Sequence, residues 1–183
     1  MIIGRMINKT NTLVRFLLIK IRFTKRIKVQ NCFSCNIKSI RVFSIQNGGI
    51  INVGDRFRTR EGVKIDANGG RIEFGSNCAI NRNSICVAHK AIIIGNNVLI
   101  GPNVCIYDHD HCFGKDGVMS NKFKDGEIII GDNVWIGAGA IILRGTRIGN
   151  NSVIGAGTVV KGDVPACSLV VGDRKNSIRK LDR

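Results

Sequence analysis

The chain has 183 residues and a formal net charge of +15, from 28 Lys and Arg against 13 Asp and Glu. This length fits one domain with a short extension at each end. Hydrophobic residues make up 44% of the chain but aromatic residues only 5%, which favours a narrow aliphatic core, and without an aromatic platform or a known module the charge does not predict nucleic-acid binding.

Residues 1–44 are expected to form a basic N-terminal extension and a first irregular coil. Residues 1–54 contain ten Lys and Arg and no Asp or Glu. The apolar residues between Val14 and Val29 are too few and too often interrupted to span a bilayer, and no small-residue cleavage site indicates a signal peptide. Two interpretations stay open. We expect an amphipathic segment that packs on the first coil, and the alternative is contact with anionic lipid headgroups or lipid-linked phosphates.

A six-residue repeat runs through residues 45–170. Ile or Val recurs at every sixth position from Ile130 to Val160, and a small or compact residue stands four positions after each. A period of six fits neither an amphipathic helix nor an alternating strand, so it indicates a repeat architecture. A Gly-rich β-sandwich would not place matching residues at two positions of six successive hexads.

The length of one coil follows from the spacing of equivalent positions. These are Val53, Phe74, Ile94, Ile130 and Ile148, whose numbers advance in steps of 21, 20, 36 and then 18. Three hexads make 18, so each coil should have three short strands and three turns, and the step of 36 indicates a large insertion. We therefore predict a triangular parallel β-helix of about six coils, with stacked aliphatic side chains inside and Gly and Asn at the turns. Its flat faces predict self-association, and we expect a homotrimer.

The repeat stops after Ile106 and resumes at Ile130, so residues 107–129 are predicted to be an inserted loop. The loop opens with the sequence Tyr107-Asp108-His109-Asp110-His111-Cys112, which holds two of the three histidines of the chain. Long excursions from a rigid scaffold commonly carry function. We therefore expect the active site at this insertion. Residues 171–183 form a C-terminal tail.

The seven cysteines predict free thiols. Cys32 and Cys35 form a lone C-x-x-C without a partner pair, so neither a zinc site nor a disulfide framework follows. Free thiols are typical of a reducing compartment. We expect a cytoplasmic protein, with peripheral contact at the inner face of the membrane as the alternative placement.

Two segments resemble the hexapeptide-repeat acyltransferases, in particular the sugar and polysaccharide O-acetyltransferases similar to galactoside and maltose acetyltransferases. The segments are Ile130-Gly131-Asp132-Asn133-Val134-Trp135-Ile136-Gly137 and Ile154-Gly155-Ala156-Gly157-Thr158-Val159-Val160, the second followed by Asp163-Val164-Pro165. The resemblance covers about residues 45–180. It implies a left-handed parallel β-helix, acetyl-CoA as co-substrate, no metal, and active sites between the subunits of a homotrimer.

The resemblance also implies roles for single residues. The catalytic histidine of the family precedes the tryptophan by a set spacing, and counting back by that spacing from Trp135 gives His111. A substrate-binding asparagine precedes the histidine in the same way, and its match is Asn81. Acetyl-CoA would lie beside the small residues Ala138 and Ala156. Arg179 matches a basic residue that binds the nucleotide end. Where the family has Thr-Lys and Gly-Asn-Pro-Ala, this chain has Lys161-Gly162 and Gly172-Asp173-Arg174-Lys175. We expect Lys161, Arg174 and Lys175 to supply the positive charge that contacts the cofactor phosphates.

These residues predict direct acetyl transfer with a general base. A sugar hydroxyl is a weak nucleophile, and general base catalysis typically contributes ~10²–10⁴ in rate. A histidine is mostly neutral at pH 7 and suits this role, so we assign it to His111, with Trp135 beside it. His109 should support it or contact the substrate. Asp108 and Asp110 either orient His111 or contact the sugar, or they are solvated loop carboxylates. His89 is predicted to be a surface or corner residue.

Three other functions stay open. A zinc lyase similar to the γ-type carbonic anhydrases would use histidine ligands, and this chain has three histidines in all. A serine acetyltransferase and a non-catalytic assembly scaffold are the other two. The acceptor itself is not evident from the sequence, but Lys115, Lys122 and Lys124 of the inserted loop would suit an anionic or lipid-phosphate-linked sugar.

Overall fold

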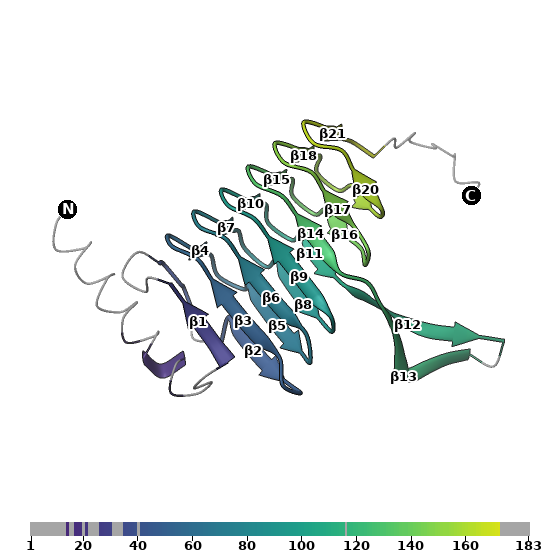
Figure 1. Cartoon of the computed structure of the whole chain (residues 1–183), viewed down its shortest axis with the longest axis horizontal. Coiled ribbons are helices and arrows are strands. Elements are labelled where there is room, and N and C mark those ends of the chain that lie inside the picture. The colour runs from purple at the N-terminus through teal and green to yellow at the C-terminus, as the bar shows by residue number, and fades with distance from the viewer. Residues whose placement is uncertain are drawn as a thin grey trace, which may run out of the picture.

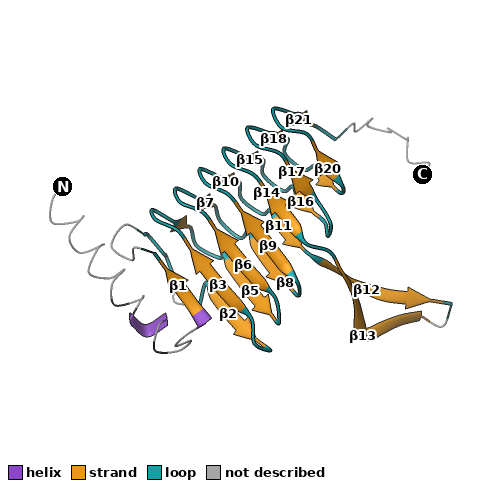
Figure 2. Cartoon of the chain, viewed as in Figure 1, coloured by secondary structure: helices purple, strands orange, loops and turns teal. Residues whose placement is uncertain are grey.

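The computed structural model describes residues 14, 17–19, 21, 26–30, 35–39, 41–115 and 117–172. These residues form an all-β parallel solenoid of about six turns, from which one antiparallel hairpin projects (Figure 1). Each turn contributes one strand to each of three parallel sheets, which we call sheets A, B and C (Figure 2). The predicted all-β repeat architecture, with three short strands per coil, is therefore confirmed.

Sheet A has seven strands in the described residues. They are β1 (Ile27–Val29), β3 (Ile50–Val53), β6 (Arg71–Phe74), β9 (Ala91–Ile94), β14 (Ile128–Ile130), β17 (Arg147–Ile148) and β20 (Asp163–Val164). Sheet B has six: β4 (Arg58–Thr59), β7 (Ala79–Ile80), β10 (Leu99–Ile100), β15 (Trp135–Ile136), β18 (Val153–Ile154) and β21 (Leu169–Val170). Sheet C also has six: β2 (Phe43–Gln46), β5 (Lys64–Asn68), β8 (Ile85–Ala88), β11 (Cys105–Tyr107), β16 (Ile141–Ile142) and β19 (Val159–Val160).

The register of sheet A matches the spacing predicted from the repeat. Val53 pairs with Phe74 and Phe74 with Ile94, and Ile94 pairs with Ile130 across the longest of the steps. Ile130 in turn pairs with Ile148. The insertion therefore leaves the stacking of the aliphatic row unchanged.

The core is the narrow interior between the three sheets. Most of the short strands bury one inward side chain there and most of the longer ones two, most often Ile or Val. The compact residues at the corners, such as Val134, Ala140 and Ser152, are buried as well. Burial raises the pKa of the Cys78 thiol to about 11 and that of Cys86 to about 12. Both thiols are therefore protonated at neutral pH and act as small apolar side chains.

Each coil turns at three corners, which we name AB, BC and CA after the sheets that they join. At the AB corner four stacked asparagines adopt positive φ angles, a conformation that asparagine tolerates better than most residues: Asn77, Asn97, Asn133 and Asn151. Each of the first three donates its side-chain amide N–H to the next at 3.0 Å. This hydrogen-bonded ladder explains the Asn that the repeat places in its turns.

The insertion at the CA corner is a β-hairpin, where the sequence predicted a loop. Its strands are β12 (His109–Gly114) and β13 (Gly117–Asp125), and their register shifts between His111 and Cys112. Every residue of β13 is exposed. The hairpin is therefore held by backbone pairing and by its base, because it has no buried face of its own.

The N-terminal region is described only in part. Val14, residues 17–19 and Ile21 are helical, and Ile19 is buried in the core. Strand β1 pairs in parallel with β3, so the first irregular coil already belongs to the solenoid. No helix in the described residues is long and apolar enough to cross a membrane.

Candidate functional site

Asp108 closes the base of the hairpin. Its side chain is fully buried, and its carboxylate accepts hydrogen bonds from the backbone N–H of His89 at 2.8 Å and of Lys90 at 2.7 Å. Its backbone carbonyl accepts from the N–H of Gly126 at 2.7 Å, which joins the two ends of the insertion. Asp108 therefore fixes where the hairpin leaves the solenoid, and its buried carboxylate is not placed to contact a substrate.

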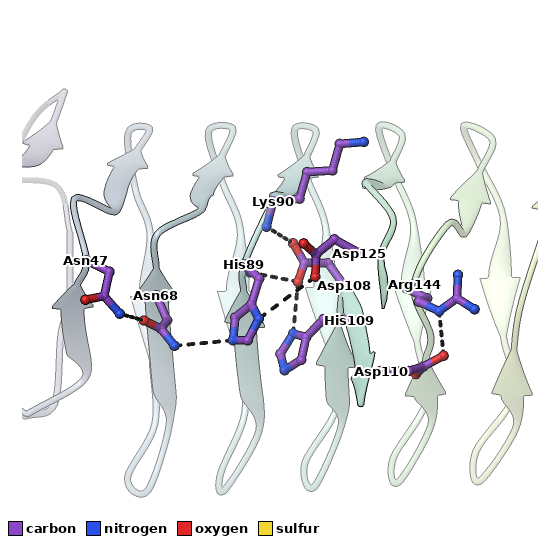
Figure 3. A network of polar contacts seen from close by, with 9 residues as sticks. All are labelled: Asn47, Asn68, His89, Lys90, Asp108, His109, Asp110, Asp125 and Arg144. Atoms are coloured by element: carbon purple, nitrogen blue, oxygen red, sulfur yellow. Dashed lines mark hydrogen bonds and ion pairs between the residues drawn. The ribbon is translucent and has the colours of Figure 1, made fainter. Parts of the chain in front are cut away.

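The same carboxylate fixes the orientation of His109. Nδ1 of His109 lies 3.1 Å from Oδ1 of Asp108 (Figure 3). An ionised carboxylate only accepts, so Nδ1 carries the proton and donates it, which leaves Nε2 with the free lone pair. The supporting role of His109 stays a prediction.

His89 and His109 form a face-to-face stack at the CA corner. Their ring centroids are 3.5 Å apart with an interplanar angle of 2°, and the ring of Phe123 from β13 meets His89 edge-on at 4.5 Å. Nε2 of His89 also lies 3.3 Å from the side-chain amide nitrogen of Asn68. Burial, and then the charge of His109, hold the pKa of His89 below its ordinary value.

This stack was not anticipated from the sequence. His89 lies at a corner, as predicted, but it is half-buried between its neighbours and not a free surface residue. One signal could have found the pair. The step from His89 to His109 equals the coil step from Phe74 to Ile94. Residues one coil apart lie side by side in a solenoid.

His111 lies further along β12 and is exposed. Its ring contacts Phe123 at a centroid distance of 4.7 Å. The prediction that Asp108 or Asp110 orients His111 is not supported by these contacts, because Asp108 binds His109 and the two backbone amides, and Asp110 forms an ion pair with Arg144. Asp110 and His111 are successive residues of β12, and successive side chains of a strand point to opposite faces.

A groove runs along the outer face of sheet B. Its volume is about 430 Å³, and its lining includes Asn81, Leu99 and Trp135. Trp135 is 55% exposed on the outer face of β15, so it lines the groove and does not pack in the interior. Asn81 is exposed at the adjoining BC corner. The structure thus brings together two of the predicted site residues, the tryptophan and the asparagine.

The BC corner above Asn81 carries the small residues predicted to face the cofactor. Ala138 and Ala156 occupy equivalent exposed positions in successive coils. The neighbouring Gly137 packs so closely on the next coil that a Cβ there would lie 2.6 Å from the backbone nitrogen of Ala156. Small side chains at this corner leave its backbone accessible to an extended ligand.

The other predicted cofactor residues do not lie at this corner. Lys161 is exposed but follows β19, so it belongs to the CA corner on the far side of sheet C. Arg174, Lys175 and Arg179 lie outside the described residues.

The predicted site is divided between two corners of one chain. The BC corner and the adjoining sheet B carry Asn81, Trp135, Ala138 and Ala156, whereas the CA corner carries His109 and His111. The hairpin projects away from the body of the solenoid and not over the strands of sheet B (Figure 1). Within one chain, the predicted base is therefore remote from the predicted acceptor and cofactor residues.

The histidines do not form a metal site within this chain. No group of three His, Cys, Asp or Glu side chains that could hold a metal ion occurs in the part of the chain that the structure describes. The parallel stack of His89 on His109 also directs their ring nitrogens side by side and not toward one point. A zinc site built from one chain is not supported.

Comparisons with known proteins identify relatives of this chain. Residues 127–162 match the family model described as "Bacterial transferase hexapeptide (six repeats)". The "Putative lipopolysaccharide biosynthesis O-acetyl transferase" of Escherichia coli K12 is 32% identical over 88% of each chain. The galactoside O-acetyltransferase of Lactococcus lactis is 43% identical over 62% of this chain, which spans only 55% of that longer protein.

A solved structure matches most of the fold. The hexapeptide-repeat acetyltransferase of Vibrio cholerae in complex with acetyl coenzyme A has a TM-score of 0.60 and 27% identity, over 87% of this chain and 72% of that one. The repeat, the solenoid and the near full-length relative lead to one conclusion: the chain belongs to the hexapeptide-repeat acetyltransferase family.

Proposed function

We propose that this protein transfers an acetyl group from acetyl-CoA to a hydroxyl of a sugar or surface-polysaccharide precursor. The names of two relatives, a lipopolysaccharide biosynthesis O-acetyl transferase and a galactoside O-acetyltransferase, support a sugar acceptor. The Vibrio cholerae structure with acetyl coenzyme A supports the donor. In this proposal the chain forms a homotrimer of left-handed β-helices.

The division of the site between two corners is the observation that carries the proposal. His111 on the projecting hairpin has no acceptor or cofactor residue beside it in its own chain, and the groove at Trp135 has no histidine among its described lining residues. In a cyclic oligomer the CA corner of one subunit can face the BC corner of the next. The hairpin of one copy would then cover the groove of its neighbour and complete a site at each interface.

The proposed reaction is a direct transfer. The imidazole of His111 removes the proton of the acceptor hydroxyl as its oxygen attacks the thioester carbonyl carbon, which gives a tetrahedral intermediate. The carbon–sulfur bond then breaks, and the proton on His111 passes to the departing CoA thiolate. The base contributes ~10²–10⁴ in rate.

Other residues bind and position the reactants in this scheme. Asn81 holds the acceptor and Trp135 forms the wall of the site, while Ala138 and Ala156 admit the pantetheine arm. Lys161, Arg174, Lys175 and Arg179 neutralise the phosphates of CoA. His109 acts through the base of the hairpin, because its bond to Asp108 and its stack on His89 hold β12 in place.

An acetyl-CoA consumption assay against a panel of sugars and nucleotide sugars tests the proposal. Wild type should consume acetyl-CoA only when an acceptor is present, and His111→Ala should be slower by ~10²–10⁴. Arg71→Ala, at an exposed position on sheet A, should behave as wild type. Equal turnover by wild type and His111→Ala would remove His111 as the base. Absence of turnover with every acceptor would favour the scaffold.

A further inference from the structure

The groove on sheet B is basic at the end that faces the N-terminal coils. Lys38, Arg58 and Arg60 line this end, whereas Leu99 and Trp135 line the other. Arg58 and Arg60 are both exposed. None of the residues assigned above to the base, the acceptor or the cofactor explains why three cations gather there.

None of these cations forms an ion pair with a carboxylate among the described residues, although Lys38 is one of the charges that act on Glu61. The nearest carboxylate in sequence, Glu61, is paired with Arg82 at 3.2 Å on the outer side of the BC corner. The undescribed N-terminal residues cannot supply a side-chain carboxylate, because residues 1–54 contain no Asp or Glu. Exposed guanidinium groups that share a groove without a counter-ion repel one another, and a bound anion would relieve that repulsion.

The register places the cations in line with the predicted acceptor site. The backbone N–H of Arg60 donates to the carbonyl of Ile80, so Arg60 lies one coil below Asn81 in the same column of the BC corner. On sheet B the outward row runs from Arg58 through Ala79 and Leu99 to Trp135. Arg58 and Trp135 are thus three strand spacings apart, or about 14 Å.

Of the proposed cofactor residues, Ala138 lies in the same coil as Trp135 and Ala156 lies one coil further toward the C-terminus. An acceptor whose hydroxyl reacts beside Trp135 must therefore extend toward the N-terminal coils, over Asn81 and into the basic end. The phosphates of CoA extend the other way along the solenoid. The basic end of the groove thus belongs to the acceptor and not to the donor.

We propose that the acceptor is a sugar carrying a phosphate or diphosphate, and that Arg58, Arg60 and Lys38 bind this group while Asn81 and Trp135 hold the sugar. Two guanidinium forks match the paired oxygens of a phosphate better than isolated ammonium groups do. A diphosphate would use all three cations. The inference rests on the acetyl-transfer function proposed above and specifies its acceptor.

The test compares acceptors that share one sugar and differ in its aglycone. The set is the methyl glycoside, the sugar 1-phosphate, the nucleoside diphosphate sugar and a short-chain polyprenyl diphosphate sugar. We expect kcat/KM to be about 10-fold higher or more for acceptors with a phosphate. Equal values for the three phosphorylated acceptors would identify the phosphate alone as the recognised group. A further gain for one of them would identify its natural source.

Charge-removing variants locate the phosphate. Arg58→Gln and Arg60→Gln should each lower kcat/KM about 10-fold for phosphorylated acceptors, mainly through KM, and leave the methyl glycoside unchanged. The matched control is Arg71→Gln, which removes an exposed charge from sheet A. The proposal is overturned if charged and neutral acceptors react equally, or if the groove variants slow both to the same extent.

A binding measurement distinguishes failure of the phosphate-site proposal from failure of the proposed acetyl-transfer function. Trp135 is the only tryptophan of the chain, so its fluorescence reports directly on the groove. With CoA saturating, inorganic diphosphate and the sugar 1-phosphate should change this fluorescence, and Arg60→Gln should weaken both titrations about 10-fold. Loss of acetyl transfer with these titrations intact would count against the function alone. Titrations unaffected by Arg58→Gln and Arg60→Gln would overturn the phosphate site.

Discussion

The BC and CA corners both border sheet C, but their construction differs. At the BC corner, successive coils present similar small residues, and the backbones are in such close contact that Gly137 has no room for a Cβ. At the CA corner, an insertion replaces the turn, and a buried carboxylate, two stacked histidines and an exposed hairpin take its place. The regular BC corner can offer a surface along which an extended ligand can lie. The irregular corner can offer titratable groups.

A mixing experiment tests whether the two corners act together across a subunit interface, and it carries the largest expected effect. His111→Ala removes the proposed base at the CA corner, and Ala138→Trp blocks the proposed cofactor position at the BC corner. His111→Ala alone should lose ~10²–10⁴ in kcat, and Ala138→Trp alone should lose turnover because acetyl-CoA no longer binds. In a randomly mixed trimer each mixed assembly has one of its three interfaces with both corners intact. Assemblies that contain both variants should therefore recover about a third of wild-type activity.

The result would be measured on doubly tagged, co-purified assemblies, with a mixture of separately purified variants as the control. No recovery in co-expressed assemblies would show that both corners must act within one chain, and the composite site would be wrong.

The difference in packing between the corners predicts unequal effects of one substitution. Gly137→Ala places a Cβ against the backbone of the next coil and should lower the free energy of unfolding by about 1–3 kcal/mol. Gly114→Ala in the hairpin meets only the end of the Met119 side chain, at 3.9 Å, and should change it by no more than about 0.5 kcal/mol. Urea titration of both variants measures the contrast, and equal losses would contradict it.

The stacked histidines should stabilise the hairpin locally. His89→Ala removes the ring that packs on His109 and Phe123, a contact expected to contribute about 0.5–1.5 kcal/mol. Amide hydrogen exchange should become faster in β12 and β13, while protection of the sheet A strands stays as in wild type. Faster exchange throughout the solenoid would instead assign His89 to the core.

The smallest expected effect is a dependence on pH. Burial and the neighbouring His109 lower the pKa of His89 in the folded chain, although Asp108 and Asp125 act in the opposite direction. When the hairpin is released, His89 therefore binds a proton more readily, so attachment of the hairpin should weaken as the pH falls below about 6.5 and stay constant above it. Hydrogen exchange of β13 at pH 5.5 and 7.5 measures this difference, which should be absent in His89→Gln.

Much of the solenoid could be predicted because the same residue types recur at fixed positions of its repeat. The positions Val53, Phe74, Ile94, Ile130 and Ile148 stack as their spacing predicted. The hairpin could not be predicted in the same way, since β13 is exposed along its whole length and carries no alternating pattern. For the same reason the direction in which His111 projects was not evident. A sequence motif identifies which residues are neighbours along the chain. It does not show which corners of the solenoid lie close together in space.

The long step between Ile94 and Ile130 has a consequence for how such enzymes diversify. Because Asp108 and Gly126 join at the base of the insertion, the coils above and below keep their register whatever lies between these two residues. Lengthening a loop costs little free energy, about 0.6 kcal/mol for each doubling. The hairpin is therefore an exchangeable module. Descendants of one scaffold can gain or lose exposed segments at this point without changing a buried residue.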